Sequence, residues 1–236
     1  MKRVSLQAPL KLNAGDPRPV DRPRPKLTGV ALSMAGTDSP DRQVLEATIA
    51  EKFSSCYGAQ LSQFLPHLLC LRTGGELGAI VGIRPASHGD LFVEQYFNRP
   101  VEQVTSGLFR EPVDRNQIVE IGNLAAARPG SASILFAALA SMLAAAGYRW
   151  AVCTATPQVV SLLRKLDFPS RPVCRARPTA VVNAADNWGN YYASAPRVLI
   201  GDVSVAAARV AHDRQLSAIV RQLSRPIERV AASLRN

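Results

Sequence analysis

A strand, a helix and a second strand follow one another between residues 117 and 155, and this order constrains the fold more than any other feature. The first strand is predicted over Gln117–Ala126, and Arg128-Pro129-Gly130 ends it. Ser131–Ala146 is Ala-rich and apolar on most faces, which is typical of a buried helix, and Arg149–Ala155 is the second strand. A helix of this length between two strands is a crossover connection, so the strands are expected to be parallel neighbours.

An antiparallel hairpin is predicted before this unit. The apolar runs His67–Thr73 and Leu77–Pro85 flank a turn at Gly74-Gly75, and a third strand is expected over Leu91–Phe97. A first helix is predicted after Ser39, which is its expected N-cap, and two shorter helices are expected over 101–107 and 157–166. Antiparallel strands followed by a parallel unit predict an α/β fold, with a mixed twisted sheet and flanking helices.

The two ends of the chain differ from this middle part. Asp16–Pro25 is Pro-rich and favours an extended conformation, and residues 1–26 carry seven basic and two acidic side chains. After Val203, apolar residues recur every three or four positions, which predicts an amphipathic helix that Pro226 kinks or divides. The predicted organisation is a basic arm over 1–38, a folded domain over 39–202 and a C-terminal helix over 203–236. That helix packs on its own domain, joins two copies in a homodimer, or lies on a membrane surface.

Composition limits the classes of function. Hydrophobic residues make up 47% of the 236 residues, which is enough for a sizeable core. The sequence has neither a long apolar run nor a secretion signal, so a cytoplasmic location without membrane insertion is expected. The cysteines and histidines lack the spacing of metal ligands, so no metal is expected. The net charge of +10 predicts a negatively charged partner, but nucleic acid is not expected because aromatic residues are only 6% and no recognition module is present.

Polar residues interrupt the predicted strand at 117–126. Glu120 and Asn123 lie on either side of Gly122 in an otherwise apolar run. A carboxylate in a central strand indicates a cavity, the alternative being a solvated edge, and the glycine indicates a bulge. A bulged strand that leads to a helix N-terminus offers backbone N–H groups to a phosphate.

Two further groups of residues are candidates for a binding site. Arg84 follows an apolar run, and Glu94 alternates with Phe92 and Tyr96 on the strand expected there. Glu94 is therefore either a pocket group or a hydrogen-bonded structural one. Trp188–Tyr192 gathers three aromatic side chains in an irregular segment, which suits either a ligand wall or a plug on the sheet.

Four segments are similar to one known family: FVEQYF at Phe92–Phe97, RNQIVEIGNLA at Arg115–Ala125, RWAVCTATP at Arg149–Pro157 and WGNYY at Trp188–Tyr192. Together they resemble the thermostable hemolysin family over about residues 42–202. More distantly, that family is similar to the GNAT and autoinducer synthase fold. Glu120–Asn123 resembles the E-[LI]-S-R pattern of autoinducer synthases, with Asn in place of Arg.

Two further patterns resemble that wider fold. Arg84–Ala86 is similar to a shortened R-L-L-P-T pattern of autoinducer synthases. Arg128–Ser133 resembles the Q/R-x-x-G-x-G/A loop of GNAT enzymes, with Ser131 and Ser133 in place of two glycines. The two serines weaken the expectation that the loop binds the diphosphate of coenzyme A.

The resemblance implies an N-acyltransferase that moves an acyl group from a thioester to an amine of a small metabolite or amino acid. Glu120 is the implied general base, and Tyr191 or Tyr192 lines the acceptor site or protonates the leaving thiolate. The implied substrate-binding residues are Arg84, Glu94, Asn123 and Trp188. The implied donor-binding residues are Leu124, Ala125, Ala126, Arg128, Gly130 and Ser131.

The implied donor is a co-substrate rather than a resident cofactor. An acidic acyl carrier protein is preferred over coenzyme A, because its charge complements the basic chain. Docking is expected at arginines such as Arg128, Arg164 and Arg171. The family name indicates an alternative, a haemolytic membrane-active protein, which the basic C-terminal helix supports.

Overall fold

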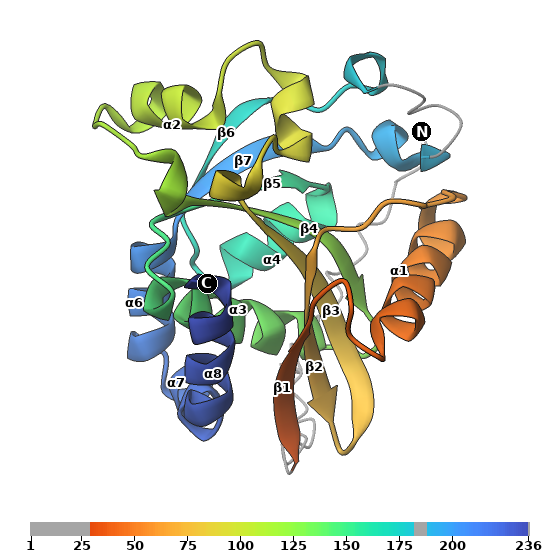
Figure 1. Ribbon diagram of the computed structural model, residues 1–236, viewed down its shortest axis with the longest axis vertical. Helices are drawn as coiled ribbons and strands as arrows, with labels where there is room; N and C mark the ends of the chain where they lie inside the picture. Colours follow the sequence, from red (N-terminus) through yellow and green to blue (C-terminus); the bar gives the residue numbers. More distant parts are fainter. Residues whose placement is uncertain (1–28, 182–187, 236) are drawn as a thin grey trace, which may run out of the picture.

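The computed structural model describes residues 29–181 and 188–235, which form a mixed seven-stranded sheet with helices on both faces (Figure 1). The strand order is β1-β2-β3-β4-β5-β7-β6, and β4 and β5 are the one parallel pair among the described strands. This arrangement confirms the predicted α/β fold class, the hairpin and the parallel crossover. The strands are β1 (Val30–Ala35), β2 (His67–Thr73), β3 (Glu76–Pro85), β4 (Ile118–Ala126), β5 (Trp150–Ala155), β6 (Ser170–Arg175) and β7 (Arg197–Asp202).

Helix α3 (Ser131–Ala145) connects the two parallel strands and is covered on several sides. It packs against β2 and β3, and it also contacts α6 (Val203–His212), α7 (Arg214–Gln222) and α8 (Ser224–Arg235). In Figure 1 these three helices lie together beside α3. A helix that is buried on most sides needs no polar face, which explains the Ala-rich apolar sequence of α3.

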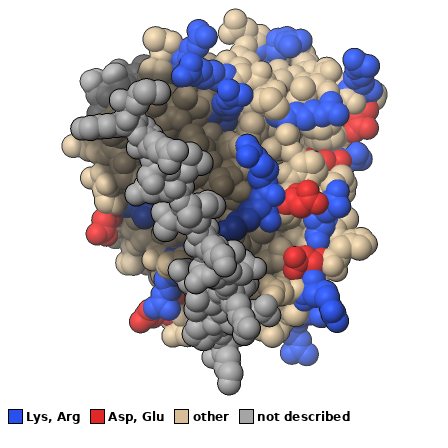
Figure 2. Space-filling model, turned by 180° about the vertical axis from the view of Figure 1, so that it is seen from behind, with Lys and Arg blue, Asp and Glu red and all other residues tan. Residues whose placement is uncertain are grey.

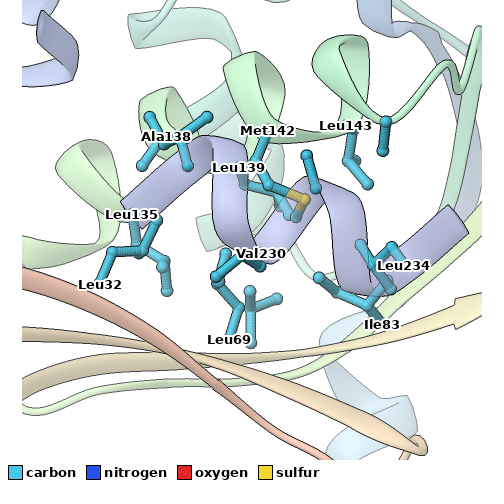
Figure 3. Close-up of a cluster of buried hydrophobic side chains, with 14 of the residues drawn as sticks. Leu32, Leu69, Ile83, Leu135, Ala138, Leu139, Met142, Leu143, Val230 and Leu234 are labelled. Carbon is cyan, nitrogen blue, oxygen red and sulfur yellow. The ribbon is translucent and has the colours of Figure 1, made fainter. Parts of the chain in front are cut away.

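The C-terminal segment belongs to the domain. Val230 and Leu234 of α8 are buried, and Figure 3 shows α8 between α3 and strands β1–β3. The single helix predicted over 203–236 is three helices. Asp213 caps α7 by accepting hydrogen bonds from two backbone N–H groups, and Pro226 lies in the first turn of α8, where proline is tolerated.

The opposite face of the sheet carries two separate groups of elements. Helix α1 (Arg42–Tyr57) packs on Leu68, Cys70 and Ile80, whose neighbours Leu69 and Leu71 face α3. A loop region with the short helices η1 (Ala86–His88), η2 (Phe92–Tyr96) and η3 (Arg115–Gln117), together with α2 (Val101–Phe109), covers the other half of the sheet. Helix α4 (Pro157–Lys165) follows β5. The candidate site lies on this second face, between α1 and η2.

Two predicted boundaries are corrected by the structure. Residues 1–28 of the predicted arm lie outside the described residues, but Val30–Ala35 is strand β1, fully paired with β2. The strand expected over Leu91–Phe97 is wrong, because this segment is the 3₁₀ helix η2. Glu94 folds the segment into a turn by accepting a hydrogen bond from Leu91 N, and a short run of alternating residues does not exclude such a turn.

Strands β4 and β5 part near their carboxyl ends. Their pairing runs from Ile118–Trp150 to Ile121–Cys153, although β4 continues to Ala126 and β5 to Ala155. Asn123 has a φ of 52°, a left-handed conformation that asparagine tolerates, and the β3–β4 register shifts by one residue there. The bulge predicted beside Gly122 is therefore confirmed, and it coincides with the parting.

Candidate active site

Glu120 lies one residue before the last paired position of β4. Its side chain is 3% exposed, and its two carboxylate oxygens accept hydrogen bonds from Phe92 N and Val93 N, each at 2.9 Å. Burial raises the pKa of Glu120 above the usual value, while these two N–H groups and the positive charge of Arg84 oppose the shift. A buried carboxylate with a raised pKa is a common feature of general bases.

Arg84 lies directly opposite Glu120 on the neighbouring strand β3, so the two side chains project from the same face. Arg84 donates one hydrogen bond, of 3.2 Å, to Asp90 O. Within residues 29–181 and 188–235, no carboxylate lies at ion-pair distance from Arg84. The guanidinium is therefore available to bind an anionic group next to Glu120.

Glu94 has no free carboxylate oxygen for a substrate. Its Oε1 accepts hydrogen bonds from Val101 N and Arg115, and its Oε2 accepts them from Leu91 N and Arg115, all between 2.7 and 2.8 Å. Burial alone would raise the pKa of Glu94, but the hydrogen bonds from Arg115 and the backbone outweigh burial and lower it. The sequence left open whether Glu94 is a pocket group or a hydrogen-bonded structural residue, and the structure favours the second interpretation.

Aromatic rings from three distant segments form a cluster next to Glu120. Trp188 contacts the rings of Phe53, Phe92, Tyr191 and Tyr192, with centroid separations between 5.3 and 6.4 Å. Backbone contact with α1 positions this segment, because Asn190 N donates to the Tyr57 carbonyl and a side chain at Gly189 would overlap that oxygen. The structure thus places Trp188 and both predicted tyrosines around η2, the element whose backbone binds the predicted base.

The tyrosine hydroxyls are proton donors at neutral pH. Tyr96 and Tyr192 share a hydrogen bond of 2.7 Å between their hydroxyls, and Tyr191 Oη lies 3.5 Å from the Thr154 carbonyl oxygen. Burial raises the pKa of Tyr191 and of Tyr192. Both phenols therefore remain protonated and can give a proton to a leaving group.

On β5, the residues at the parting have unusual side chains. Thr154 Oγ1 is buried and has no hydrogen-bond partner within the described part of the chain. Such a hydroxyl costs about 1–3 kcal/mol, which favours a role in binding a ligand. Burial raises the pKa of the neighbouring Cys153 thiol to about 12, so this thiol is protonated and a poor nucleophile.

An apolar cavity of about 70 Å³ lies behind the parting, on the α3 face of the sheet. Ile121 and Cys153, the last paired residues of β4 and β5, line it at one end. Phe136 and Ala140 of α3 line another wall. This cavity has the polarity required for an aliphatic chain.

The predicted donor-binding residues lie along β4 and at the start of α3. Leu124, Ala125 and Ala126 belong to the part of β4 beyond its pairing with β5, and Ala125 and Ala126 pair with β3 on the other side. Gly130 precedes α3 with a φ of 82°, and this helix start has no side-chain cap.

Other predicted positions are occupied by internal contacts. The Ser131 hydroxyl lies 2.7 Å from both Gly78 O and Arg128 O, and the Arg128 guanidinium pairs with Glu76. Asn123 Oδ1 accepts a hydrogen bond from Leu65 N, so its side chain fixes the segment before β2. These contacts give Ser131 and Asn123 structural roles.

Several residues of the site were not found from the sequence. Phe53, Tyr57 and Thr154 reach the site from a helix and a strand that are far from Glu120 in the sequence. Arg115 lies shortly before Glu120 in the sequence, but its partner Glu94 belongs to another element. Arg115 lies inside one of the segments that carry the family resemblance, which was the one available signal. No motif of fixed spacing connects these residues, so only the folded chain brings them together.

Comparison with known proteins identifies the family. The model of the family described as thermostable hemolysin matches residues 35–207. The chain belongs to this family. A comparison with curated protein sequences finds no match. The matched range includes every strand from β2 to β7, and therefore the whole parting and its surroundings.

Solved structures show which fold the family member has. The AHL synthase LasI is similar with a TM-score of 0.51 and 12% identity, over 75% of this chain and 94% of that one. TofI, in a ternary complex with an inhibitor and MTA, is similar with a TM-score of 0.51 and 15% identity, over 79% of this chain and 98% of that one. FeeM, an N-acyl amino acid synthase from uncultured soil microbes, is similar with a TM-score of 0.51 and 11% identity, over 77% of this chain and 95% of that one. This thermostable hemolysin family member therefore has the GNAT-like fold of these synthases.

Proposed function

We propose that this protein is an N-acyltransferase that transfers an acyl group from a thioester to the amine of a small metabolite or amino acid. The observation that carries the proposal is the buried Glu120, held by two backbone N–H groups, where β4 and β5 part in a GNAT-like sheet. The synthases with similar folds are named for products or activities of this class. The same chemistry requires a cleft for the thioester and a base for the amine.

In the proposed reaction, the thioester lies between the parted ends of β4 and β5. Backbone groups near Leu124 hydrogen-bond the pantetheine arm and stabilise the oxyanion that forms at the carbonyl. The amine forms the new C–N bond, Glu120 accepts its proton directly or through a water, and the C–S bond breaks. Tyr191 or Tyr192 gives a proton to the leaving thiolate. Direct transfer is favoured over an acyl-cysteine intermediate, because Cys153 is protonated.

The acceptor is proposed to be an amino acid with an apolar or aromatic side chain. Its ammonium group would approach Glu120, and its carboxylate would pair with Arg84 on the neighbouring strand. The rings of Phe92, Trp188 and Tyr191 would contact its side chain and attract its ammonium group. An amino acid and its decarboxylated amine form a matched pair of substrates, and Arg84→Gln should reduce the kcat/KM of the amino acid alone.

The donor is proposed to be an acyl carrier protein. Ser131 is engaged with the β3 and loop carbonyls, so this position offers less to a diphosphate than the glycine of the GNAT loop. Basic side chains predominate over acidic ones on the face shown in Figure 2, which complements an acidic carrier. Of the three predicted docking arginines, Arg128 follows the end of β4, Arg164 lies in the last turn of α4, and Arg171 donates a hydrogen bond to Leu108 O.

The test measures thiol release from acyl carrier protein and acyl-CoA donors with a panel of amino acids, using the purified full chain. Mass spectrometry of co-purified small molecules selects the panel. Glu120→Gln should reduce turnover at least about 10²-fold, the range of a general base, while Glu102→Gln at a solvent-facing ion pair should not. Circular dichroism verifies that both variants fold. Wild-type turnover in Glu120→Gln would contradict the proposed mechanism.

The choice of donor is tested by salt. With the carrier-bound donor, the apparent KM should rise steeply from low to physiological ionic strength, because exposed charges are screened beyond about 8–10 Å. Equal turnover of acyl-CoA without salt dependence would contradict the proposal that the donor is an acyl carrier protein. Within residues 29–181 and 188–235 no helix is long and apolar enough to cross a membrane. Release of dye from liposomes without thioester turnover would instead support the haemolytic alternative.

A further inference from the structure

The loop region that covers Glu120 is held by a partly exposed ion-pair network. Arg115 donates to both carboxylate oxygens of Glu94 at 2.7 and 2.8 Å, and to Glu102 at 2.9 Å. The same guanidinium donates to the carbonyls of Ala86 and Gly89, at 2.8 and 2.7 Å. One arginine therefore connects η1, η2, η3 and α2, four elements whose sequence order alone leaves their arrangement open.

Glu94 connects this ion-pair network to the turn whose backbone binds Glu120. It accepts hydrogen bonds from Leu91 N at 2.7 Å and Val101 N at 2.8 Å, and so ties the start of η2 to the start of α2. The next two N–H groups after Leu91, those of Phe92 and Val93, are the donors to Glu120. Any movement of this turn therefore changes both hydrogen bonds of the carboxylate together.

We propose that Arg115 and Glu94 are positioning residues, which align the Phe92 and Val93 N–H groups and thereby stabilise the ionised form of Glu120. The proposal rests on the proposed function, because it assigns Glu120 the role of a base. Neither residue contacts the reacting atoms in this scheme. Both act through the geometry of one turn.

The charges around Glu120 are consistent with this role. Arg84 from β3 favours the ionised carboxylate, whereas Glu94 and Tyr96 from η2 and the Cys153 thiol from β5 do not. Burial raises the pKa of Glu120, so the two N–H groups are a main opposing contribution. If the turn loosens, the base becomes protonated at a higher pH and less of it is active at neutral pH.

The experiment compares Glu94→Gln and Arg115→Gln with the control Glu102→Gln in the full chain. Glu102 pairs with Arg115 but binds neither Leu91 N nor Val101 N. The ¹³C resonance of the Glu120 carboxyl, assigned by its absence in Glu120→Gln, reports the protonation midpoint directly. We expect Arg115→Gln to raise this midpoint by about one pH unit, the loss of one hydrogen bond to a charged group. Glu94→Gln should raise it less, because this variant also removes a negative charge that disfavours ionised Glu120. Glu102→Gln should leave it unchanged.

The acid limb of the turnover profile should move with the NMR midpoint, and Arg115→Lys, which keeps the charge, should restore part of the shift. If Arg115→Gln does not fold, Arg115→Lys decides, because it should raise the midpoint by part of the same shift. An unchanged midpoint in a folded Arg115 variant contradicts the inference. Full turnover in Glu120→Gln contradicts the proposed function instead, and the NMR result distinguishes the two failures.

Discussion

At the scale of single residues, Glu120 combines burial with hydrogen bonding. A glutamate in water has a pKa near 4.3, and burial raises the pKa of Glu120. In the folded state, its proton is therefore lost at higher pH than in the unfolded chain. The free energy of unfolding therefore decreases as pH rises from the pKa of Glu120 in the unfolded chain through its pKa in the folded state.

This shift predicts the pH dependence of activity. Because a general base must be unprotonated, kcat/KM should fall as pH decreases through a midpoint above 4.3. The measurement is kcat/KM between about pH 4 and 9, with unfolding followed in parallel to separate inactivation from titration. A limb at or below the ordinary glutamate value would assign the base elsewhere.

Thr154 provides a second prediction at this scale. Its buried hydroxyl has no partner among the described residues. Thr154→Val keeps the shape of the side chain, so it should leave the free energy of unfolding unchanged or raise it slightly. If the hydroxyl binds substrate, the same variant should raise KM several-fold, and Thr154→Ser should keep it low. An unchanged KM in Thr154→Val would mean that the hydroxyl does not contact the substrate.

At the scale of elements, the bulge in β4 depends on its close approach to β3 at Gly82. A Cβ at Gly82 would lie 2.9 Å from Asn123 Oδ1 and 2.9 Å from Leu65 Cβ. Gly82 therefore allows Asn123 to reach Leu65 N, and the left-handed Asn123 in turn accompanies the end of pairing with β5. The cleft is thus built by contacts across three segments.

Gly82→Ala should destabilise the protein by about 1–3 kcal/mol, the usual cost of overpacking. Gly107→Ala is the matched control, because a Cβ there meets nothing within 4 Å and lies inside helix α2. There alanine should be neutral or stabilising by up to about 1 kcal/mol. Urea unfolding of both variants measures the difference, and equal stabilities would contradict the assigned contact.

The cavity behind the parting gives a prediction about donor length. Ala140 lines it and is buried, so Ala140→Leu should fill much of its roughly 70 Å³. If the acyl chain enters this cavity, the variant should lower kcat/KM for long acyl donors much more than for an acetyl donor. An equal loss for both donors would indicate a general packing defect.

At the scale of the whole molecule, the C-terminal helices complete the core. Leu234 and Val230 of α8 pack with Leu139 and Met142 of α3 and with Leu69 of β2 (Figure 3). Sheet and α3 together leave an apolar surface that α8 covers. The predicted C-terminal helix is therefore part of the folded domain rather than an appendage.

Leu234→Ala should accordingly destabilise the protein by about 2–5 kcal/mol, the cost of a large-to-small change in a core. Arg229→Ala on the exposed side of the same helix is the control and should change stability by less than about 0.5 kcal/mol. Thermal or urea unfolding checks both. If the two variants have the same stability, α8 does not contribute to the core.

The sequence alone determined the features that depend on local patterns. The hairpin at Gly74-Gly75, the crossover through Ser131–Ala145 and the polar Glu120 in an apolar strand were predicted because turn chemistry and periodicity act over a few residues. The family resemblance added the GNAT-like fold. Short or weakly patterned elements, such as β1 and β6, were missed because their pairing partners supply most of their stability.

Only the tertiary structure decided what each polar residue does. Glu94 alternates with aromatic residues in the sequence, yet its oxygens bind Arg115 and two backbone N–H groups. Arg115 and Thr154 acquire roles through contacts with residues tens of positions away. The physical reason is that burial and hydrogen bonding are set by the packing of distant segments, and these two quantities determine whether a side chain is a base, a support or a free ligand group.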